Sequence, residues 1–201
     1  MNLFTRALLP YLLLITSFSS FAQKPPVADI LGVPSTLTLG NINYKLSWSS
    51  HPDAGYYKEE FMPAGQTSAK FTNMILLDAV TPVADINHAV DGKLAELAEL
   101  QKTNTYIFFR ELDAPAGERI IDFTITANGA DGKTPAIAER NVYRYRQFTG
   151  KDGSKGLLLF GVAERAYGSA IPAFLDKLKT SRDKLVALVR SFTIPVFTKL
   201  Q

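Results

Sequence analysis

The fold is decided by the run AIAERNVYRYRQF at residues 136–148. In an extended strand the side chains alternate between two faces, so Arg140, Arg144 and Arg146 share one face and the two tyrosines share the other. The run therefore predicts one long strand. It belongs to a series of four consecutive predicted strands, a pattern typical of an antiparallel sheet.

Three further strands are predicted earlier in the chain, where apolar and polar residues again alternate or short apolar runs are bounded by turn residues. Trp48, the sole tryptophan, ends the apolar face of the first of them, and we expect it to pack in the core. The last predicted strand is almost wholly apolar in its first half, as in a central strand covered on both faces. The predicted strands are Ile42–Trp48, Tyr56–Met62, Asn73–Val80, Thr105–Leu112, Arg119–Ala127, Ala136–Phe148 and Gly156–Glu164.

Two segments carry apolar residues at three- and four-residue spacing and predict helices. The first is Ala84–Thr103, with Asp85 as its N-cap, and the second is Ser169–Phe192. Thr180–Asp183 has the residues to recap the chain and split the second helix, but the apolar phase continues through it, so we expect a continuous or bent helix. The predicted class is α+β: an antiparallel sheet of about six or seven strands, with an inserted helix and a long C-terminal amphipathic helix packed on it.

The first 22 residues have the pattern of a secretory signal peptide. Arg6 precedes an apolar run, and the segment ends on the small-x-small pattern at residues 20–22 that signal peptidase recognises. An uncleaved membrane anchor would need an apolar run of roughly 20 residues. We therefore expect cleavage after Ala22, a periplasmic or secreted protein, an extended leader at residues 23–40 and a single α+β domain at residues 41–201.

Composition limits the classes of protein. The chain has no cysteine, which excludes disulfides, thiol catalysis, thiolate metal sites and a lipid-modified cysteine. Its 22 basic and 19 acidic residues are interspersed, whereas nucleic-acid binding normally needs a clustered basic face. We expect no nucleic-acid partner and no stable membrane anchor.

The expected order of elements is a short strand, a hairpin, one helix, an antiparallel meander and a terminal helix that runs into VRSFTI at residues 189–194. This layout resembles the PsbP-like fold over most of the mature chain, and the short C-terminal run carries the local likeness. The resemblance implies an accessory or assembly role, in which members of that family often serve. A second stretch, YKEEFMPAGQT at residues 57–67 followed by FTNM at residues 71–74, is similar to a segment of uncharacterised secreted bacterial proteins.

The mature chain offers few groups for catalysis. His51 and His88 are its only imidazoles, and neither belongs to a nucleophile motif. The pairs His51-x-Asp53 and His88-x-x-Asp91 are possible metal ligands, but no His-x-x-x-His or acidic loop motif accompanies them. The loop Gly150–Gly156 lacks the Gly-Lys-Ser/Thr ending of a phosphate-binding loop. We predict no metal and no cofactor, and we favour a non-enzymatic protein.

The arginine row is the main candidate for a binding site. Guanidinium groups match carboxylates and phosphates, so Arg140, Arg144 and Arg146 could bind an anionic ligand or the acidic surface of a partner. The competing interpretation is a solvated sheet face, balanced by acidic neighbours. Glu59 and Glu60 point to opposite faces of a strand, and an inward carboxylate there would need a partner or a raised pKa. Glu59 is therefore included in the predicted site.

Two functions follow from these candidates. We predict an exported, non-enzymatic binding domain that engages another protein in the bacterial envelope. The alternative is a small-ligand binder or hydrolase with a pocket between the sheet and the C-terminal helix, in which Arg140, Arg144 or Glu59 would be the polar anchors. A cavity of several hundred Å³ with convergent polar groups would favour the alternative.

Overall fold

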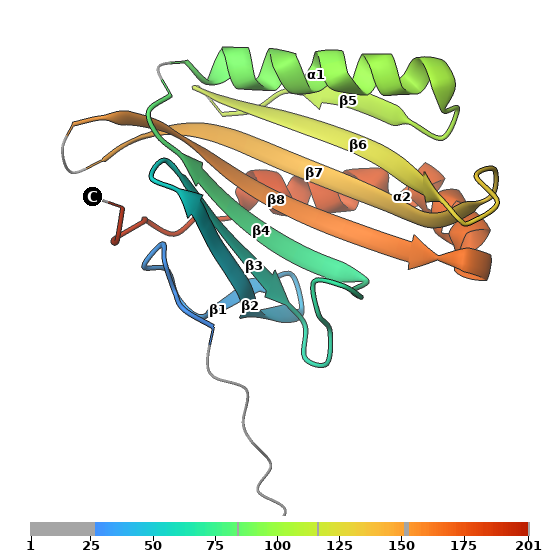
Figure 1. The fold of residues 1–201 in the computed structure, drawn as a ribbon, viewed down its shortest axis with the longest axis horizontal. Helices are drawn as coiled ribbons and strands as arrows, with labels where there is room; N and C mark the ends of the chain where they lie inside the picture. Colours follow the sequence, from blue (N-terminus) through green and yellow to red (C-terminus); the bar gives the residue numbers. More distant parts are fainter. Residues whose placement is uncertain (1–26, 84, 116, 151–152, 201) are drawn as a thin grey trace, which may run out of the picture.

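One antiparallel sheet with a helix on each face forms the protein (Figure 1). The computed structural model describes residues 27–83, 85–115, 117–150 and 153–200. The α+β class is as predicted, but the described sheet has eight strands rather than six or seven, because the sequence pattern does not reveal the short first strand. The strands are β1 (Thr36–Leu39), β2 (Ile42–Asp53), β3 (Tyr56–Met62), β4 (Asn73–Val80), β5 (Phe108–Leu112), β6 (Glu118–Asn128), β7 (Pro135–Thr149) and β8 (Lys155–Tyr167).

Two meanders meet at the centre of the sheet, whose strand order is β1-β2-β3-β4-β8-β7-β6-β5. The last strands of the two meanders, β4 and β8, pair there, from Asn73 with Glu164 to Val80 with Leu157. Residues 156–163 of β8 are all buried, which confirms the prediction of a central strand covered on both faces. In this order β1 and β5 are the edge strands.

Helix α1 (Ile86–Thr103) connects β4 to β5 and lies against β5 and β7 on one face of the sheet (Figure 1). The Asp85 carboxylate accepts a hydrogen bond from the Asn87 N–H at 2.8 Å, so the predicted N-cap is confirmed. Val90 and Leu97 are fully buried and pack into the cluster that contains Phe123.

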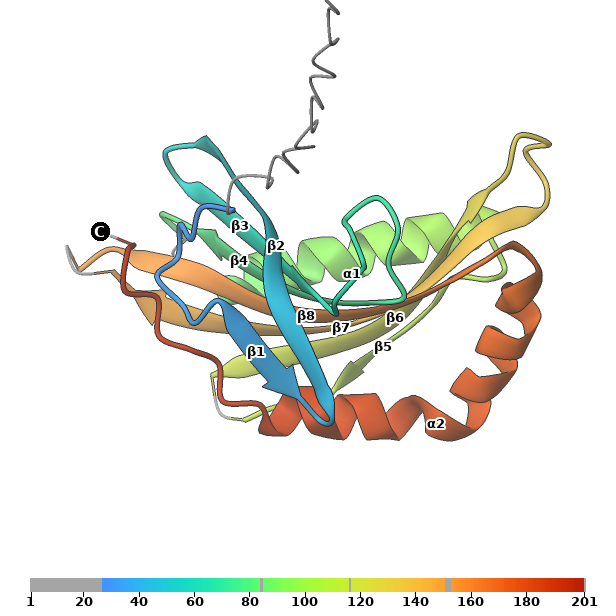
Figure 2. The same ribbon diagram turned by 90° about the horizontal axis from the view of Figure 1, so that it is seen from below.

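Helix α2 (Ile171–Ser191) covers the opposite face, after one turn of 3₁₀-helix, η1 (Gly168–Ala170). It is continuous and visibly bent, as predicted (Figure 2). The Ser181 hydroxyl donates to the Lys177 carbonyl oxygen at 2.8 Å, and such bonds to the preceding turn often bend helices. The bend lets α2 follow the twisted sheet.

The segments before β1 and after α2 lie side by side. The Lys199 N–H donates to the Leu31 carbonyl oxygen at 3.1 Å, and the Thr198 hydroxyl donates to the Gly32 carbonyl oxygen at 2.8 Å. Leu31 and Val33 are buried in the core. Part of the segment expected as an extended leader, residues 23–40, thus belongs to the folded domain, while the predicted signal peptide lies outside the described residues.

The prediction that Trp48 packs in the core is wrong. Strand β2 has a register shift between Leu46, which pairs with Phe61, and Trp48, which pairs with Glu60. Phe61 and Glu60 are neighbours on β3 and point to opposite faces, so the shift turns Trp48 away from the face of Leu46. Trp48 is 41% exposed. A bulge of this kind interrupts alternation without leaving a mark in the composition of the strand.

Candidate binding site

The predicted arginine row shares one face of β7, as alternation indicates, but α2 covers that face. Arg140 is 1% and Arg144 7% exposed, whereas Arg146 is only partly buried. Arg140 and Arg144 therefore form neither a solvated face nor a surface that a partner can reach. For these two arginines, the prediction of a binding surface and the competing prediction of a solvated face are both corrected. Alternation along one strand shows which side chains share a face, but not which helix packs on it.

Arg144 joins the C-terminal end of α2 to the sheet. Its Nη1 donates to the carbonyl oxygens of Val189, Arg190 and Phe192 at 3.2, 2.9 and 2.9 Å, and its Nε donates to Glu118. The last carbonyls of a helix have no partner within the helix, so a buried guanidinium satisfies them and offsets their partial negative charge. The Nε and Nη1 donors of Arg144 are thus used inside the protein.

Glu59 points inward and holds the N-terminal segment. Its Oε1 accepts from the backbone N–H groups of Ile30 at 2.7 Å and Leu31 at 3.1 Å, while its buried Oε2 has no hydrogen-bond partner among the described residues. Burial raises the pKa of Glu59 and the Asp29 carboxylate raises it further, against the lowering effect of the two N–H groups. No ion pair between Glu59 and Arg140 or the other arginines of the row occurs in the described part of the chain.

An open groove of about 480 Å³ lies between the β5 edge of the sheet and α2. Tyr106 and Phe108, 47% and 44% exposed, stand on the sheet side, and Leu175 and Leu178 face them from the helix. The charged lining residues are Arg110, Lys179, Arg182 and Asp183. The volume meets the criterion set above for a ligand pocket, but the polar groups that line it differ from those that the sequence predicted.

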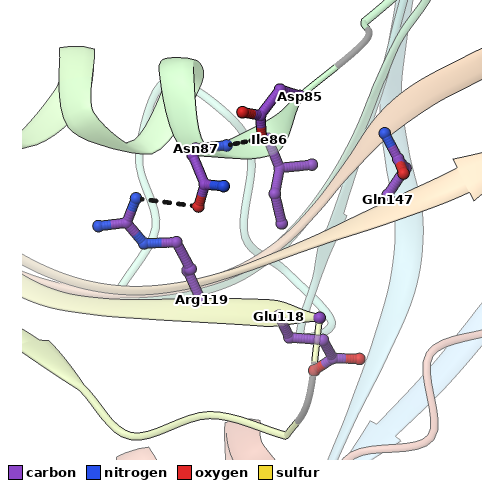
Figure 3. A pocket seen from close by; sticks show the side chains of 7 residues that line it. Asp85, Ile86, Asn87, Glu118, Arg119 and Gln147 are labelled. Atoms are coloured by element: carbon purple, nitrogen blue, oxygen red, sulfur yellow. Dashed lines mark hydrogen bonds between the residues drawn. The ribbon is translucent and has the colours of Figure 1, made fainter.

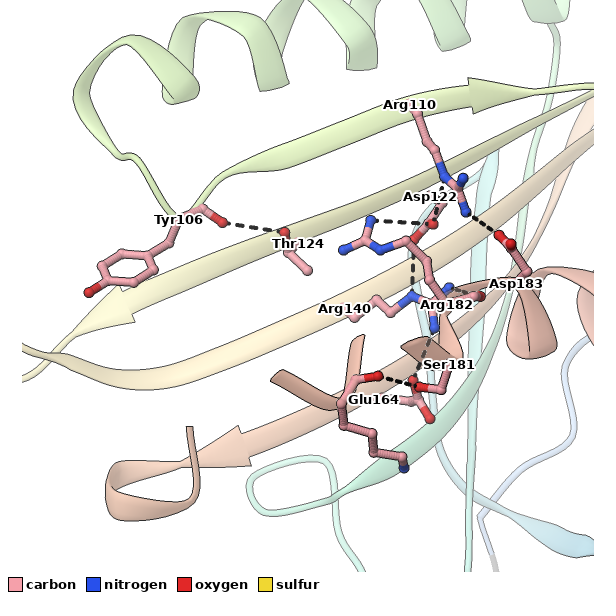
Figure 4. Close-up of polar contacts among 10 residues, drawn as sticks. Tyr106, Arg110, Asp122, Thr124, Arg140, Glu164, Ser181, Arg182 and Asp183 are labelled. Carbon is pink, nitrogen blue, oxygen red and sulfur yellow. Dashed lines mark hydrogen bonds and ion pairs between the residues drawn. The ribbon is translucent and has the colours of Figure 1, made fainter. Parts of the chain in front are cut away.

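One carboxylate beside the groove receives three arginines (Figure 4). Asp122, fully buried on β6, accepts from Arg140 Nε on Oδ1 at 3.0 Å, and from Arg110 Nε at 3.1 Å and Arg182 Nη1 at 3.3 Å on Oδ2. Arg110 also donates to Asp183 at 2.8 Å. A single buried negative charge shared by three guanidinium groups leaves local positive charge incompletely compensated.

Arg182 is the least compensated of the three. Arg140 has two further acceptors, Glu164 and the Arg182 carbonyl oxygen, whereas the Arg182 guanidinium lies over the Phe108 ring, with its carbon 4.2 Å from the ring centroid. Burial lowers the pKa of Arg182, and the positive charges of Arg140 and Arg110 lower it further against the attraction of Asp122. The guanidinium stays charged at neutral pH, so it faces the groove as a cation.

A second pocket, of about 370 Å³, lies at the N-terminus of α1 and is built differently (Figure 3). Its arginine, Arg119, donates to both oxygens of Glu111 at 2.5 and 2.9 Å, to Asp91 at 2.6 Å and to Asn87 at 3.3 Å. These acceptors, Glu111 first, raise the pKa of Arg119. Arg119 is therefore neutralised by its own neighbours.

The histidines do not assemble a reactive site. His51 stacks on Tyr57 with ring centroids 4.0 Å apart, and its Nδ1 lies 2.9 Å from the Tyr56 carbonyl oxygen. His88 is exposed on α1. Among the described residues no three or more potential ligands of the types His, Asp and Glu are placed to hold a metal ion.

The fold and the groove define a two-faced α+β domain with an open, arginine-lined cleft at one sheet edge. A protein-family model matches residues 31–194, and the chain belongs to this uncharacterised bacterial family. The match leaves the PsbP-like resemblance unconfirmed. No curated protein and no solved structure matches the chain significantly.

Within the described ranges, no helix has the length and apolar character needed to cross a membrane. Sequence reasoning missed Arg110 and Arg182, which lie on elements far apart in the chain. Two signals point toward them: Arg182 falls within Thr180–Asp183, where a helix break seemed possible, and Arg110 belongs to the predicted strand Thr105–Leu112.

Proposed function

We propose that this protein is an exported, non-enzymatic binding domain that engages another protein in the bacterial envelope, and that the groove between β5 and α2 is its binding surface. The observation that carries the proposal is the combination of exposed aromatic side chains with an incompletely neutralised arginine in one open groove. Aromatic and arginine side chains are enriched where proteins bind each other.

The position of the groove adds support. Strand β5 is at the edge of the sheet, so its outer backbone groups have no neighbouring strand among the described residues. Extended segments of partner proteins commonly add to such an edge, with main-chain hydrogen bonds giving affinity and side-chain pockets giving specificity. Tyr106 and Phe108 stand beside this edge. An accessory role, which the PsbP-like layout implies by resemblance, is compatible with a domain that acts by binding.

Site-specific photo-crosslinking tests the proposal. A photoreactive phenylalanine in place of Tyr106 should link the full chain to one protein in the envelope of the producing bacterium. The matched control replaces Trp48, which is 41% exposed at the other end of the sheet. The same adduct from both positions, or none from Tyr106, contradicts the proposal. Recovery of a mature chain that begins at Gln23 from the periplasm or medium tests export.

A small-ligand binder is the second candidate, because the groove volume of about 480 Å³ falls within the range of ordinary ligand pockets. This candidate predicts a small molecule that is released when the purified protein is denatured and is identified by mass spectrometry. A Tyr106→Ala variant should then release less of it than a Trp48→Ala variant. Equal release from the two variants rules out the groove as the ligand site.

A further inference from the structure

Most hydrogen-bond donors of the Arg182 guanidinium have no partner among the described residues. A guanidinium has five N–H donors, and only one from Arg182, the bond to Asp122 at 3.3 Å, is made among the described residues. The side chain is nevertheless 17% exposed. Arg119, with a matching exposure of 19%, uses its guanidinium on Glu111, Asp91 and Asn87. The difference is therefore in the partners and not in access to water.

The groove offers this guanidinium a planar platform and apolar walls. The Arg182 guanidinium lies over the Phe108 ring, and Tyr106 and Leu175 line the same space. A guanidinium placed over a ring, with donors that have no partner among the described residues, is suited to a bidentate pair with a carboxylate. A ligand with an apolar group next to its carboxylate would fill both parts of the groove.

The local charges favour a single negative charge. Three arginines meet Asp122, Asp183 and Glu164, but Asp183 is 88% exposed and its contribution is screened by water. About one positive charge, centred on Arg182, thus lacks a buried counter-ion. A monoanion compensates it, whereas a dianion would bring excess negative charge close to Asp183 and Asp122.

We propose that the groove recognises an acidic side chain that stands next to an apolar one in an extended segment of the partner, with the carboxylate paired to Arg182 and the apolar group against Tyr106 and Leu175. This inference rests on the proposed function and specifies the chemistry of the partner. Segments with these two features bind the groove, and segments in which the acid is replaced by its amide bind less tightly.

The test uses 3-phenylpropionate, which carries a carboxylate next to a ring, and its neutral amide as the matched probe. Titration of the ¹⁵N-labelled mature chain should shift the Arg182 Nε–H and Tyr106 amide signals to saturation. We expect the amide to bind about tenfold more weakly, because it lacks the charge-assisted pair. Equal affinity of the two probes, no shift at Arg182, or tighter saturation by inorganic phosphate overturns the inference.

Substitutions at Arg182 separate the contribution of its positive charge to affinity from that of its planar guanidinium group. Arg182→Gln should lose about tenfold in affinity for 3-phenylpropionate and Arg182→Lys should lose an intermediate amount, because Lys keeps the charge but not the planar fork. Arg119→Gln is the matched control and should bind as the unmodified chain does. The same loss in the Arg119 and Arg182 variants contradicts the assignment. Amide spectra with native dispersion confirm that each variant is folded.

The crosslinking experiment distinguishes a failure of this inference from a failure of the proposed function. If the adduct at Tyr106 forms equally well in the Arg182→Gln variant, the protein binds its partner through the groove without the arginine, and only the inference fails. If no adduct forms from Tyr106 in the unmodified background, the proposed function fails, whatever the affinity for 3-phenylpropionate.

Discussion

Two regions of the interface between α2 and the sheet use arginine for different purposes. At the C-terminal end of the helix, Arg144 donates to three helix carbonyls and to Glu118, and that end is closed. Near the middle of α2, Arg182 makes one long bond to Asp122 and faces an open groove. Arg144 thus fastens the helix to the sheet through several acceptors, whereas Arg182, with one acceptor among the described residues, marks a candidate binding site.

The largest effect should come from removing the shared carboxylate. Asp122→Asn should lower the free energy of unfolding by about 3–5 kcal/mol, because three arginines then lose their buried counter-ion. Urea denaturation at neutral pH measures the change. In the control, Asp183→Asn, the lost carboxylate is 88% exposed and also pairs with Arg110, so the loss should stay below about 1 kcal/mol. Equal losses would show that Asp122 is not the electrostatic centre of this region.

A smaller effect is expected at the closed end. Glu118→Gln should cost about 1.5–3 kcal/mol, because Arg144 loses an ionic partner but keeps its three carbonyl acceptors. The side chain of Glu118 is 8% exposed. Glu164, at 25% exposed and 3.4 Å from Arg140, is the matched control, and its change to Gln should cost less than about 1 kcal/mol. A larger loss of unfolding free energy in Glu164→Gln than in Glu118→Gln would contradict this expectation.

The smallest effect on stability is expected from Glu59, a buried carboxylate that has no arginine partner among the described residues. Its pKa is raised in the folded state, so between its ordinary value of 4.5 and the raised value the folded chain holds more protons than the unfolded chain. Stability therefore falls as pH rises through that window, by at most about 1.4 kcal/mol per pH unit for one proton. Glu59→Gln keeps the oxygen that accepts from Ile30 and Leu31 and should flatten this slope.

Denaturation at several pH values measures the slope. The control is Asp131, whose pKa is lowered to about 2 by hydrogen bonds, chiefly from Thr134. Asp131 has already titrated below the window, so Asp131→Asn should leave the slope above pH 4.5 unchanged. A stability that rises with pH between 4.5 and neutrality in the unmodified chain, and no longer does so in Glu59→Gln, would contradict the sign.

Much of the fold follows from local pattern. The alternation in β7, the cap at Asp85 and the continuous phase of α2 are properties of neighbouring residues, and each of these predictions is confirmed. The failures come from events that local pattern does not record. The bulge before Trp48 reverses a face, and β1 has only four residues, fewer than a reliable alternation needs.

The candidate site is harder to predict because it depends on how distant elements pack. The sequence predicts that Arg140 and Arg144 share a face, but only the packing of α2 shows that this face is covered. Arg110 and Arg182 come together through Asp122, and no spacing in the chain records that meeting. Charge and residue type pointed to guanidinium groups, but the arginines that line the groove, Arg110 and Arg182, are not those that the sequence predicted.

The most direct test compares Arg144→Gln with Arg182→Gln in the free energy of unfolding. Both changes remove one guanidinium from the interface between α2 and the sheet. We expect a loss of about 3 kcal/mol for Arg144→Gln, because buried carbonyls and Glu118 lose their partner, and less than about 1 kcal/mol for Arg182→Gln. Equal losses, or a larger loss for Arg182→Gln, would contradict the claim that Arg182 contributes little to stability and is available to bind a ligand.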